Sequence, residues 1–368
     1  METALKNTIA FIRPADQTAM EAARARQASL AKPPRSLGQL EEMGVRLAGV
    51  TGQVHNQLKK RRIVVMCADN GVCAEGVSAT PQSVTLAQTV NLTRGMTGAS
   101  ALAHHFGDEI VVVDVGVMSD VPSSKVVNKK VAYGTKNLRH EPAMTRQQAL
   151  QAVMAGIEQA CIAKAEGVDA LGVGEMGIGN TTTSSAVLAA LTGASVEAVT
   201  GRGGGLLDKA FAVKKQVIRE ALEKHQPDPD DPIDVLAKVG GFDLCAMCGV
   251  FLGAAAERIP VVIDGFISVV AALCAARLCP HVKDFLFPSH ASFEVGYSIA
   301  VKELGLQPFL LLDMRLGEGS GCPLAFLTME AACAVMNEMA TFAEAAINDD
   351  YLEEIRKGDQ FTVKGAEK

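Results

Sequence analysis

Short apolar runs alternate with longer amphipathic segments along most of the chain. The runs are rich in Val, Ile and Leu and end in polar or glycine-rich turns, which predicts buried strands. The amphipathic segments, such as 145–167, repeat their apolar positions every three to four residues, which predicts helices. Strands that alternate with helices favour a mostly parallel sheet with helices on both faces. The segments expected to hold strands are 61–71, 108–117, 168–174, 260–265, 284–289 and 308–314.

The two ends of the chain carry helical patterns without the strand-like runs of the middle. Helices are expected in the first sixty residues and in a long segment over 322–347, followed by a polar tail. Such helices need another apolar face to cover their own. We therefore expect a small helical lobe from residues 1–60 with 325–368, and a large α/β domain over 61–324.

Composition narrows the class of protein. The 368 residues are 48% hydrophobic but only 4% aromatic, with 34 Gly and no Trp, which fits α/β layers better than an aromatic-rich sandwich. The net charge is −6 and no basic run is interleaved with aromatic residues, so no nucleic-acid partner is expected. The apolar stretch 259–278 contains Pro260, Asp264 and Ser268, which predicts a buried strand and helix rather than a membrane span.

Nine cysteines are scattered through apolar segments, and the chain does not begin with a signal-like apolar segment. An odd number of cysteines in this context predicts reduced thiols and a cytoplasmic protein. Cys245 and Cys248 form a single CxxC in an apolar helical pattern, for which core packing is expected rather than zinc. No metal site and no cofactor are predicted.

Several expected strands end in loops that contain Asp or Glu together with Gly. These loops are "ADNG", "VDVG", "GVGEMGIGNTTT", "IDGF" and "LLDMRLGEGSG". In a parallel sheet such loops gather at the carboxyl edge, where ligands bind. The sequence therefore predicts one shared pocket.

The loop "GVGEMGIGNTTT" contains a G-x-G-x-x-G run at Gly172, Gly174 and Gly177. This run matches a dinucleotide fingerprint, and an NAD-dependent dehydrogenase is one interpretation. The acidic residue that should follow a second strand about twenty residues later is missing. Hydroxyls at a helix start instead favour a seat for a single phosphate, although Asn180 or Thr181 could simply cap the helix.

Two charged residues are candidates for catalysis and for phosphate binding. Glu318 lies between glycines in "RLGEGSG" and could act as a general base, unless it is a surface turn glutamate. Lys214 follows the flexible "GRGGG" and could reach back to the phosphate. With Lys209 and Lys215 it could equally form a solvated helix face.

Eight motifs together resemble one family. They include "KPPRSLGQLE", "ADNGVCAEGVSATPQSVT", "NLTRGMTGASALA", "GVGEMGIGNTTTSSA", "KVGGFDLCAMCGVFLGAA", "VVIDGFIS", "PSHASFEVG" and "MRLGEGSGCPLAF". In this order, from about Leu30 to Ile347, the chain resembles the nicotinate-nucleotide–dimethylbenzimidazole phosphoribosyltransferases, which act in cobamide (vitamin B12-type) lower-ligand synthesis. The resemblance implies a Rossmann-like sheet with a small helical lobe. It also implies the conversion of nicotinate mononucleotide and an aromatic base to the base's α-ribotide 5′-phosphate and nicotinate, with inversion at C1′.

The resemblance also implies roles for individual residues. Glu318 matches the catalytic glutamate. The nucleotide and phosphate site is implied at Glu175, Gly177, Gly179, Asn180, Thr181, Thr182, Gly203, Lys214, Asp243, Asp264 and Ser292. The acceptor-base pocket is implied at Thr80, Pro81, Met176, Leu316 and Gln88.

Three positions depart from the family pattern. Asn70 stands where the family usually has His, Arg35 where it has Gly, and Thr80 where Ser is common. Asn70 and Thr80 are expected near the acceptor pocket, so the acceptor could be dimethylbenzimidazole or, as in some relatives, phenol or p-cresol. A homodimer, a heterodimer with a paralogous subunit and a non-catalytic partner subunit all stay open.

Overall fold

The computed structural model describes residues 1–352 and 355, which fall into two compact units. The larger unit contains Met1–Pro14 and Leu58–Leu327, and the smaller contains Ala15–Gln57 with the residues from Thr328 onward. Residues 1–14, which were predicted to join the small lobe, belong to the larger unit. They form the helix α1 (Glu2–Phe11), which packs on helices α6 and α11 of that unit.

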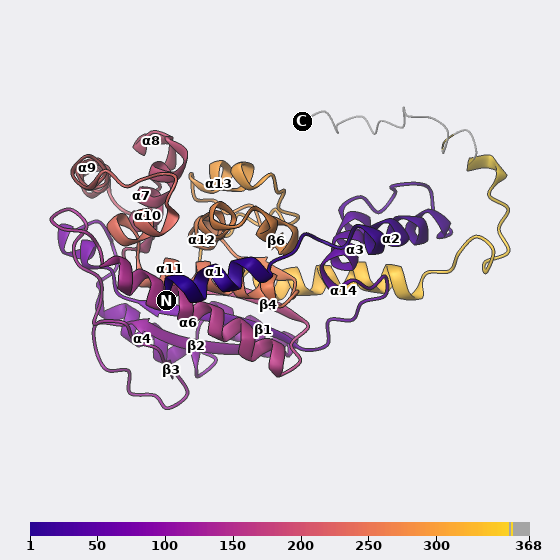
Figure 1. Cartoon of the computed structure of the whole chain (residues 1–368), viewed down its shortest axis with the longest axis horizontal. Helices are drawn as coiled ribbons and strands as arrows, with labels where there is room; N and C mark the ends of the chain where they lie inside the picture. Colours follow the sequence, from indigo (N-terminus) through magenta and orange to yellow (C-terminus); the bar gives the residue numbers. More distant parts are fainter. Residues whose placement is uncertain (353–354, 356–368) are drawn as a thin grey trace. The chain divides into compact units, whose positions relative to one another are not determined.

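A single six-stranded parallel sheet forms the centre of the larger unit (Figure 1). Its strand order is β3-β2-β1-β4-β5-β6, which is the order of a doubly wound Rossmann sheet. Every residue of β1 and β4 is buried, as expected for apolar runs covered on both faces. The strands are β1 Arg61–Ala68, β2 Glu109–Gly116, β3 Val127–Asn128, β4 Ala170–Met176, β5 Val261–Ile263 and β6 Leu286–Pro288.

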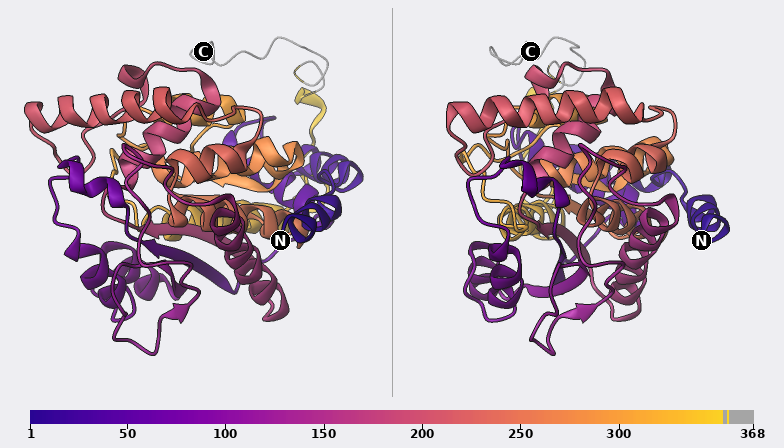
Figure 2. Two further views of the ribbon diagram at one scale, coloured as in Figure 1. Left: turned by 60° about the vertical axis from the view of Figure 1, so that its left-hand side comes forward. Right: turned by 90° about the vertical axis from the view of Figure 1, so that its left-hand side faces the viewer.

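Helices flank both sides of this sheet (Figure 2). The apolar helix α11 is buried along almost its whole length and packs against β1, β2 and β4. Cys245 and Cys248 lie in its buried surface, which confirms the core packing predicted for them. The helices of the larger unit after α1 are α4 Ser83–Leu92, α5 Gly98–Phe106, α6 Arg146–Ala165, α7 Asn180–Thr192, α8 Val196–Val199, α9 Asp208–His225, α10 Pro232–Val239, α11 Phe242–Ala256, α12 Phe266–Leu278 and α13 Tyr297–Leu304, with 3-10 turns η1 Gly71–Glu75 and η2 Pro280–Phe285.

The smaller unit is helical. Its helices are α2 Gln17–Ser29, α3 Gln39–Thr51 and the second half of α14 Cys322–Glu338, followed by the short turn η3 Asp350–Leu352. Ala23, Ala48 and Met336 lie in its apolar core. Arg35 has a left-handed backbone with φ of 59°, a conformation that favours glycine, which explains the glycine usual in the family at this position.

Two expected elements differ from the structure. Residues 308–314 do not form a strand: Leu310 makes only an isolated bridge to His290, and Leu311 and Leu312 are exposed. The C-terminal helix ends at Glu338 rather than near residue 347. Within the described part of the chain, no helix is long and apolar enough to cross a membrane.

Candidate active site

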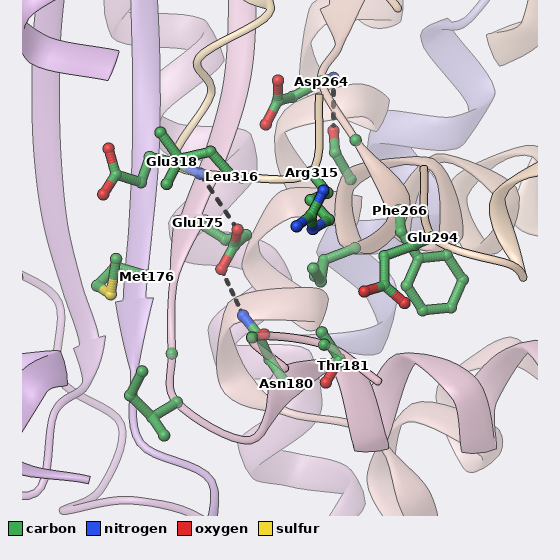
Figure 3. Close-up of a pocket in the computed structure, with 18 of the residues that line it drawn as sticks. Glu175, Met176, Asn180, Thr181, Asp264, Phe266, Glu294, Arg315, Leu316 and Glu318 are labelled. Carbon is green, nitrogen blue, oxygen red and sulfur yellow. Dashed lines mark hydrogen bonds between the residues drawn. The ribbon is translucent and has the colours of Figure 1, made fainter. Parts of the chain in front are cut away.

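A pocket lies at the carboxyl ends of β4 and β5, beside the point where the strand order reverses between β1 and β4 (Figure 3). This is the edge at which open parallel sheets bind ligands. The pocket brings together most of the predicted site residues. Those that line it are Thr80, Gln88, Glu175, Met176, Gly177, Gly179, Asn180, Thr181, Gly203, Asp264, Ser292, Leu316 and Glu318.

The glycines of the G-x-G-x-x-G run allow other parts of the chain to approach β4 and the loop that follows it. A side chain at Gly174 would meet the carbonyl oxygen of Glu318 and lie 2.6 Å from its carbonyl carbon. A side chain at Gly177 would lie 2.5 Å from the carbonyl oxygen of Ala68. The run therefore serves backbone packing within the protein, which accounts for a dinucleotide-like pattern without a dinucleotide partner.

No side chain caps the start of α7, the helix that follows this loop. Gly179 is the N-cap residue of α7, with φ of 93° and no side-chain hydrogen bond. The alternative that Asn180 or Thr181 merely caps the helix is therefore wrong. The N–H groups of Asn180 and Thr182 donate to the carbonyl oxygens of Gly177 and Gly179, so it is the positive end of the helix dipole at Thr181 that suits an anion.

Lys214 reaches this helix start from α9. Its side chain is fully buried, and its Nζ donates to Thr181 Oγ1 at 2.8 Å and to the carbonyl oxygen of Gly201 at 3.0 Å. Burial lowers the pKa of Lys214 to about 8. These contacts use two of the three N–H donors of the ammonium and place its charge directly behind Thr181, which lines the pocket. The alternative of a solvated helix face is therefore wrong for Lys214, whereas Lys209 is exposed.

Glu175 lies near the carboxyl end of β4 and is buried. Its Oε2 accepts a hydrogen bond from Asn180 Nδ2, and its Oε1 accepts from the backbone N–H of Glu318 at 3.3 Å. Burial raises the pKa of Glu175 to about 8, and the nearby carboxylate of Asp243 adds to this rise. The raised pKa favours the protonated, neutral form of Glu175.

Glu318 does not follow a strand, because residues 308–314 form none. It lies in a loop with left-handed backbone, with φ of 64° between Gly317 at 82° and Gly319 at 87°. Its buried carboxylate accepts a hydrogen bond from the backbone N–H of Ala99 in the first turn of α5, at 3.1 Å. The alternative that Glu318 is a glutamate in a surface turn is therefore wrong.

Asp264 holds this loop from the end of β5. Its two carboxylate oxygens accept from the backbone N–H groups of Gly319 at 3.0 Å and Gly321 at 2.7 Å. Burial raises the pKa of Asp264 to about 7. The pocket thus contains a glutamate whose position is fixed by contacts from β4, β5 and α5.

Four predicted residues do not line the pocket. Thr182 and Asp243 are buried behind it, and Pro81 is exposed. Lys214 reaches it only through Thr181. Asn70 is also buried behind the loop, beside Asp243, and does not line the pocket, whereas Thr80 does.

Comparisons with known proteins identify one family. A family model described as "Phosphoribosyltransferase" matches residues 12–347. A nicotinate-nucleotide–dimethylbenzimidazole phosphoribosyltransferase of Clostridium perfringens (strain ATCC 13124) is 54% identical over 335 residues, which cover 91% of this chain and 93% of the relative. One of Clostridium tetani is 49% identical over 354 residues, covering 96% and 98%. The crystal structure of CobT from Thermus thermophilus matches with a TM-score of 0.87 and 42% identity over 90% of this chain and 99% of that one.

The chain belongs to the nicotinate-nucleotide–dimethylbenzimidazole phosphoribosyltransferase family. This confirms the resemblance drawn from the eight motifs, and the doubly wound sheet confirms the predicted fold. The comparisons give no support to the branch that uses phenol or p-cresol, or to a dehydrogenase.

The pocket also contains Arg315 and Glu294, which were not singled out from the sequence, and His290 of the "PSHAS" motif. Arg315 and Glu294 line it, and the Arg315 guanidinium lies 5.7 Å from the ring centre of Phe293. His290 is buried against Ser289 Oγ at 3.0 Å, and burial lowers its pKa to about 4. The position of Arg315 directly before Leu316 was the available signal. Within the described residues, no group of three His, Cys, Asp or Glu could hold a metal ion.

Proposed function

We propose that this pocket converts nicotinate mononucleotide and dimethylbenzimidazole to the α-ribotide 5′-phosphate and nicotinate, for cobamide lower-ligand synthesis. The observation that carries the proposal is the placement of two unlike groups around one pocket. The start of α7, where Lys214 donates a hydrogen bond to Thr181, borders the pocket on one side. The carboxylate of Glu318, held by the N–H of Ala99, lies on the other side of the pocket from Thr181 (Figure 3). The larger unit, which contains every lining residue, is assigned the catalytic role.

The chemistry needs little beyond these two groups. The nicotinate of the mononucleotide is a pyridinium, so its C1′–N bond breaks with the electron pair returning to the ring nitrogen. A benzimidazole nitrogen attacks C1′ from the opposite face and inverts it. The second ring nitrogen then loses its proton to Glu318, whose carboxylate is the general base. Glu175, as a neutral acid on the nucleotide side, can donate a hydrogen bond to a ribose hydroxyl.

An acceptor panel tests the proposal directly. The purified chain is incubated with nicotinate mononucleotide and dimethylbenzimidazole, phenol or p-cresol, and ribotide is measured by chromatography. We expect a benzimidazole ribotide. Absence of ribotide with every acceptor overturns the proposal, and a phenol ribotide alone overturns the assigned acceptor. Addition of NADH without a fluorescence change excludes the dehydrogenase.

Replacement of Lys214 by methionine should raise the KM for nicotinate mononucleotide about 10- to 50-fold, the scale of one lost charge-assisted hydrogen bond. Methionine has a similar volume, so the buried site stays filled. Since the positive charge of Lys214 beside Thr181 favours a phosphate at this helix start, the wild-type KM should also rise as the pH increases through about 8. Steady-state kinetics from pH 6.5 to 9 check both effects.

The exposed Lys209 provides the matched control, because it lies on the same helix. Lys209→Met should leave the KM and its pH dependence unchanged. A KM for Lys214→Met within twofold of wild type would remove Lys214 from the phosphate site.

We also infer a homodimer rather than a pairing with a paralog. Phe293, Val295, Leu311 and Leu312 are exposed on two adjacent segments, which are joined by a hydrogen bond from the backbone N–H of Phe293 to the carbonyl oxygen of Met314 at 3.0 Å. Grouped exposed apolar side chains are typical of an interface.

All nine cysteines are free thiols, which supports a reducing compartment such as the cytoplasm.

Replacement of Leu311 by aspartate should shift the chain toward monomer, because a charge would have to be buried at the interface. Sedimentation velocity at micromolar concentration measures the change. Lys302→Asp, on the exposed surface of α13, serves as the control for an added acid. A wild-type monomer at these concentrations would contradict the homodimer.

A further inference from the structure

We propose that Asp243, which lies outside the pocket, is a positioning residue for the reaction and acts through Asn180 and Glu175 on the backbone of Glu318. The inference rests on the proposed function, since it assigns a role within that same site. The resemblance placed Asp243 among the nucleotide-binding residues. Its complete burial behind the pocket points to an indirect role instead.

A continuous line of hydrogen bonds joins Asp243 to the loop that carries Glu318 (residues 315–321, the catalytic loop). Asp243 Oδ2 accepts from Asn180 Nδ2 at 3.1 Å, and the same amide nitrogen donates to Glu175 Oε2. Glu175 Oε1 then accepts from the backbone N–H of Glu318. The line therefore runs from the start of α11, through the first residue of α7 and the end of β4, to the left-handed residue that carries the catalytic carboxylate (Figure 3 shows its last three members).

Two glycines allow the backbone to lie close to the carboxylate of Asp243. A side chain at Gly177 would lie 2.6 Å from Asp243 Oδ2, and one at Gly241 would lie close to both Asp243 Oδ1 and Asn70 Oδ1. The rest of α11 is apolar and buried. A buried carboxylate is costly unless it is hydrogen-bonded, and Asp243 accepts from the backbone N–H of Leu244 at 3.0 Å and from Asn180 Nδ2. The hydrogen bond from Asn180 Nδ2 orients the Asn180 side chain, and an apolar residue in place of Asp243 could not accept it.

Asp243 also acts on Glu175 by its charge. The two carboxyl groups share one neutral amide, which has two N–H donors and no charge to offset theirs. Burial raises the pKa of Glu175 to about 8 and that of Asp243 to about 6. Loss of the Asp243 charge should therefore lower the pKa of Glu175.

Other charged or titratable groups near Glu175 belong to several elements and stay in place in such a variant. They are Asp264 after β5, Glu318 and Arg315 in the loop before α14, and the thiol of Cys67 on β1.

Two variants separate positioning from charge. Asp243→Asn keeps an acceptor oxygen for Asn180 and removes the charge, whereas Asp243→Leu removes both. We expect kcat to fall up to about tenfold in Asp243→Asn and about 30-fold in Asp243→Leu, within the range of coupled active-site residues. The KM for dimethylbenzimidazole should change less than twofold, because the acceptor pocket does not contact Asp243.

A direct measurement of Glu175 provides a readout that a merely structural role would not move. The pKa of Glu175 is followed by carbon-13 NMR in glutamate-labelled protein, with Glu175→Gln to assign the signal. We expect a decrease of about one unit in Asp243→Asn, as for removal of a nearby like charge, with a parallel shift of the pH profile of kcat. Asp231→Asn, at the N-cap of α10, makes the same change at another helix start and should lower only thermal stability.

The outcomes are distinguishable. A folded Asp243→Asn with an unchanged Glu175 pKa and wild-type kcat overturns the positioning role. Absence of ribotide formation by the wild-type chain overturns the proposed function, while the NMR titration still decides whether Asp243 controls Glu175.

Discussion

Replacement of Glu318 by glutamine should lower kcat for ribotide formation by about a hundredfold or more, the scale of a lost general base. Glutamine keeps the size of the side chain and an oxygen that can accept from the backbone N–H of Ala99. It cannot take the proton that the acceptor ring releases. Rapid-quench or steady-state assays with saturating substrates measure the loss.

The KM for nicotinate mononucleotide and the melting temperature of Glu318→Gln should stay close to wild type. The substitution leaves the proposed phosphate site at the start of α7 unchanged, as well as the backbone hydrogen bonds that hold the loop. Glu141→Gln, an exposed glutamate, is the control for the substitution itself. Near-normal turnover in Glu318→Gln would remove Glu318 from the role of base.

The sheet could be predicted from the sequence because strands buried on both faces are continuous apolar runs. β1 and β4 are such runs, and the loops after them gather at one edge. The two-residue β3 is too short to produce a pattern. Residues 308–314 are apolar for a different reason: Leu311 and Leu312 are exposed, so an apolar run here marks a surface rather than a strand.

The position of Glu318 could be inferred only in part. Flanking glycines indicated a loop close to a ligand, but the contacts that hold it come from Asp264, Glu175 and Ala99, which are distant in sequence. Arg315 and Glu294 are single polar residues without a repeating pattern, so only the fold brings them to the pocket.

The glycine run also shows how far the site could be predicted from the sequence. A glycine pattern indicates that something approaches the backbone closely, but it does not say what approaches. In a dinucleotide fold the neighbour is a pyrophosphate. Here the neighbour of Gly174 is the backbone of Glu318, so the run and the catalytic loop are parts of one arrangement.

Replacement of Gly174 by alanine should therefore lower kcat by about a hundredfold, since displacement of a catalytic group by about 1 Å can cost that much. The new methyl group would lie 2.6 Å from the carbonyl carbon of Glu318 and 2.7 Å from the backbone nitrogen of Gly319. These are backbone atoms, which cannot rotate away as a side chain could, so the loop must move.

A matched variant and a double variant decide whether Gly174→Ala acts through Glu318. Gly193→Ala lies at the end of α7 with φ of 69° and nothing within 4 Å, so it should cost only about 1 kcal/mol of stability and leave kcat unchanged. If the loop shift is the cause, Gly174→Ala combined with Glu318→Gln should be no slower than Glu318→Gln alone, because both remove the same function. Multiplicative losses in the double variant would mean that Gly174 serves the reaction by another route, and wild-type kcat in Gly174→Ala would mean that β4 does not fix the position of the catalytic loop.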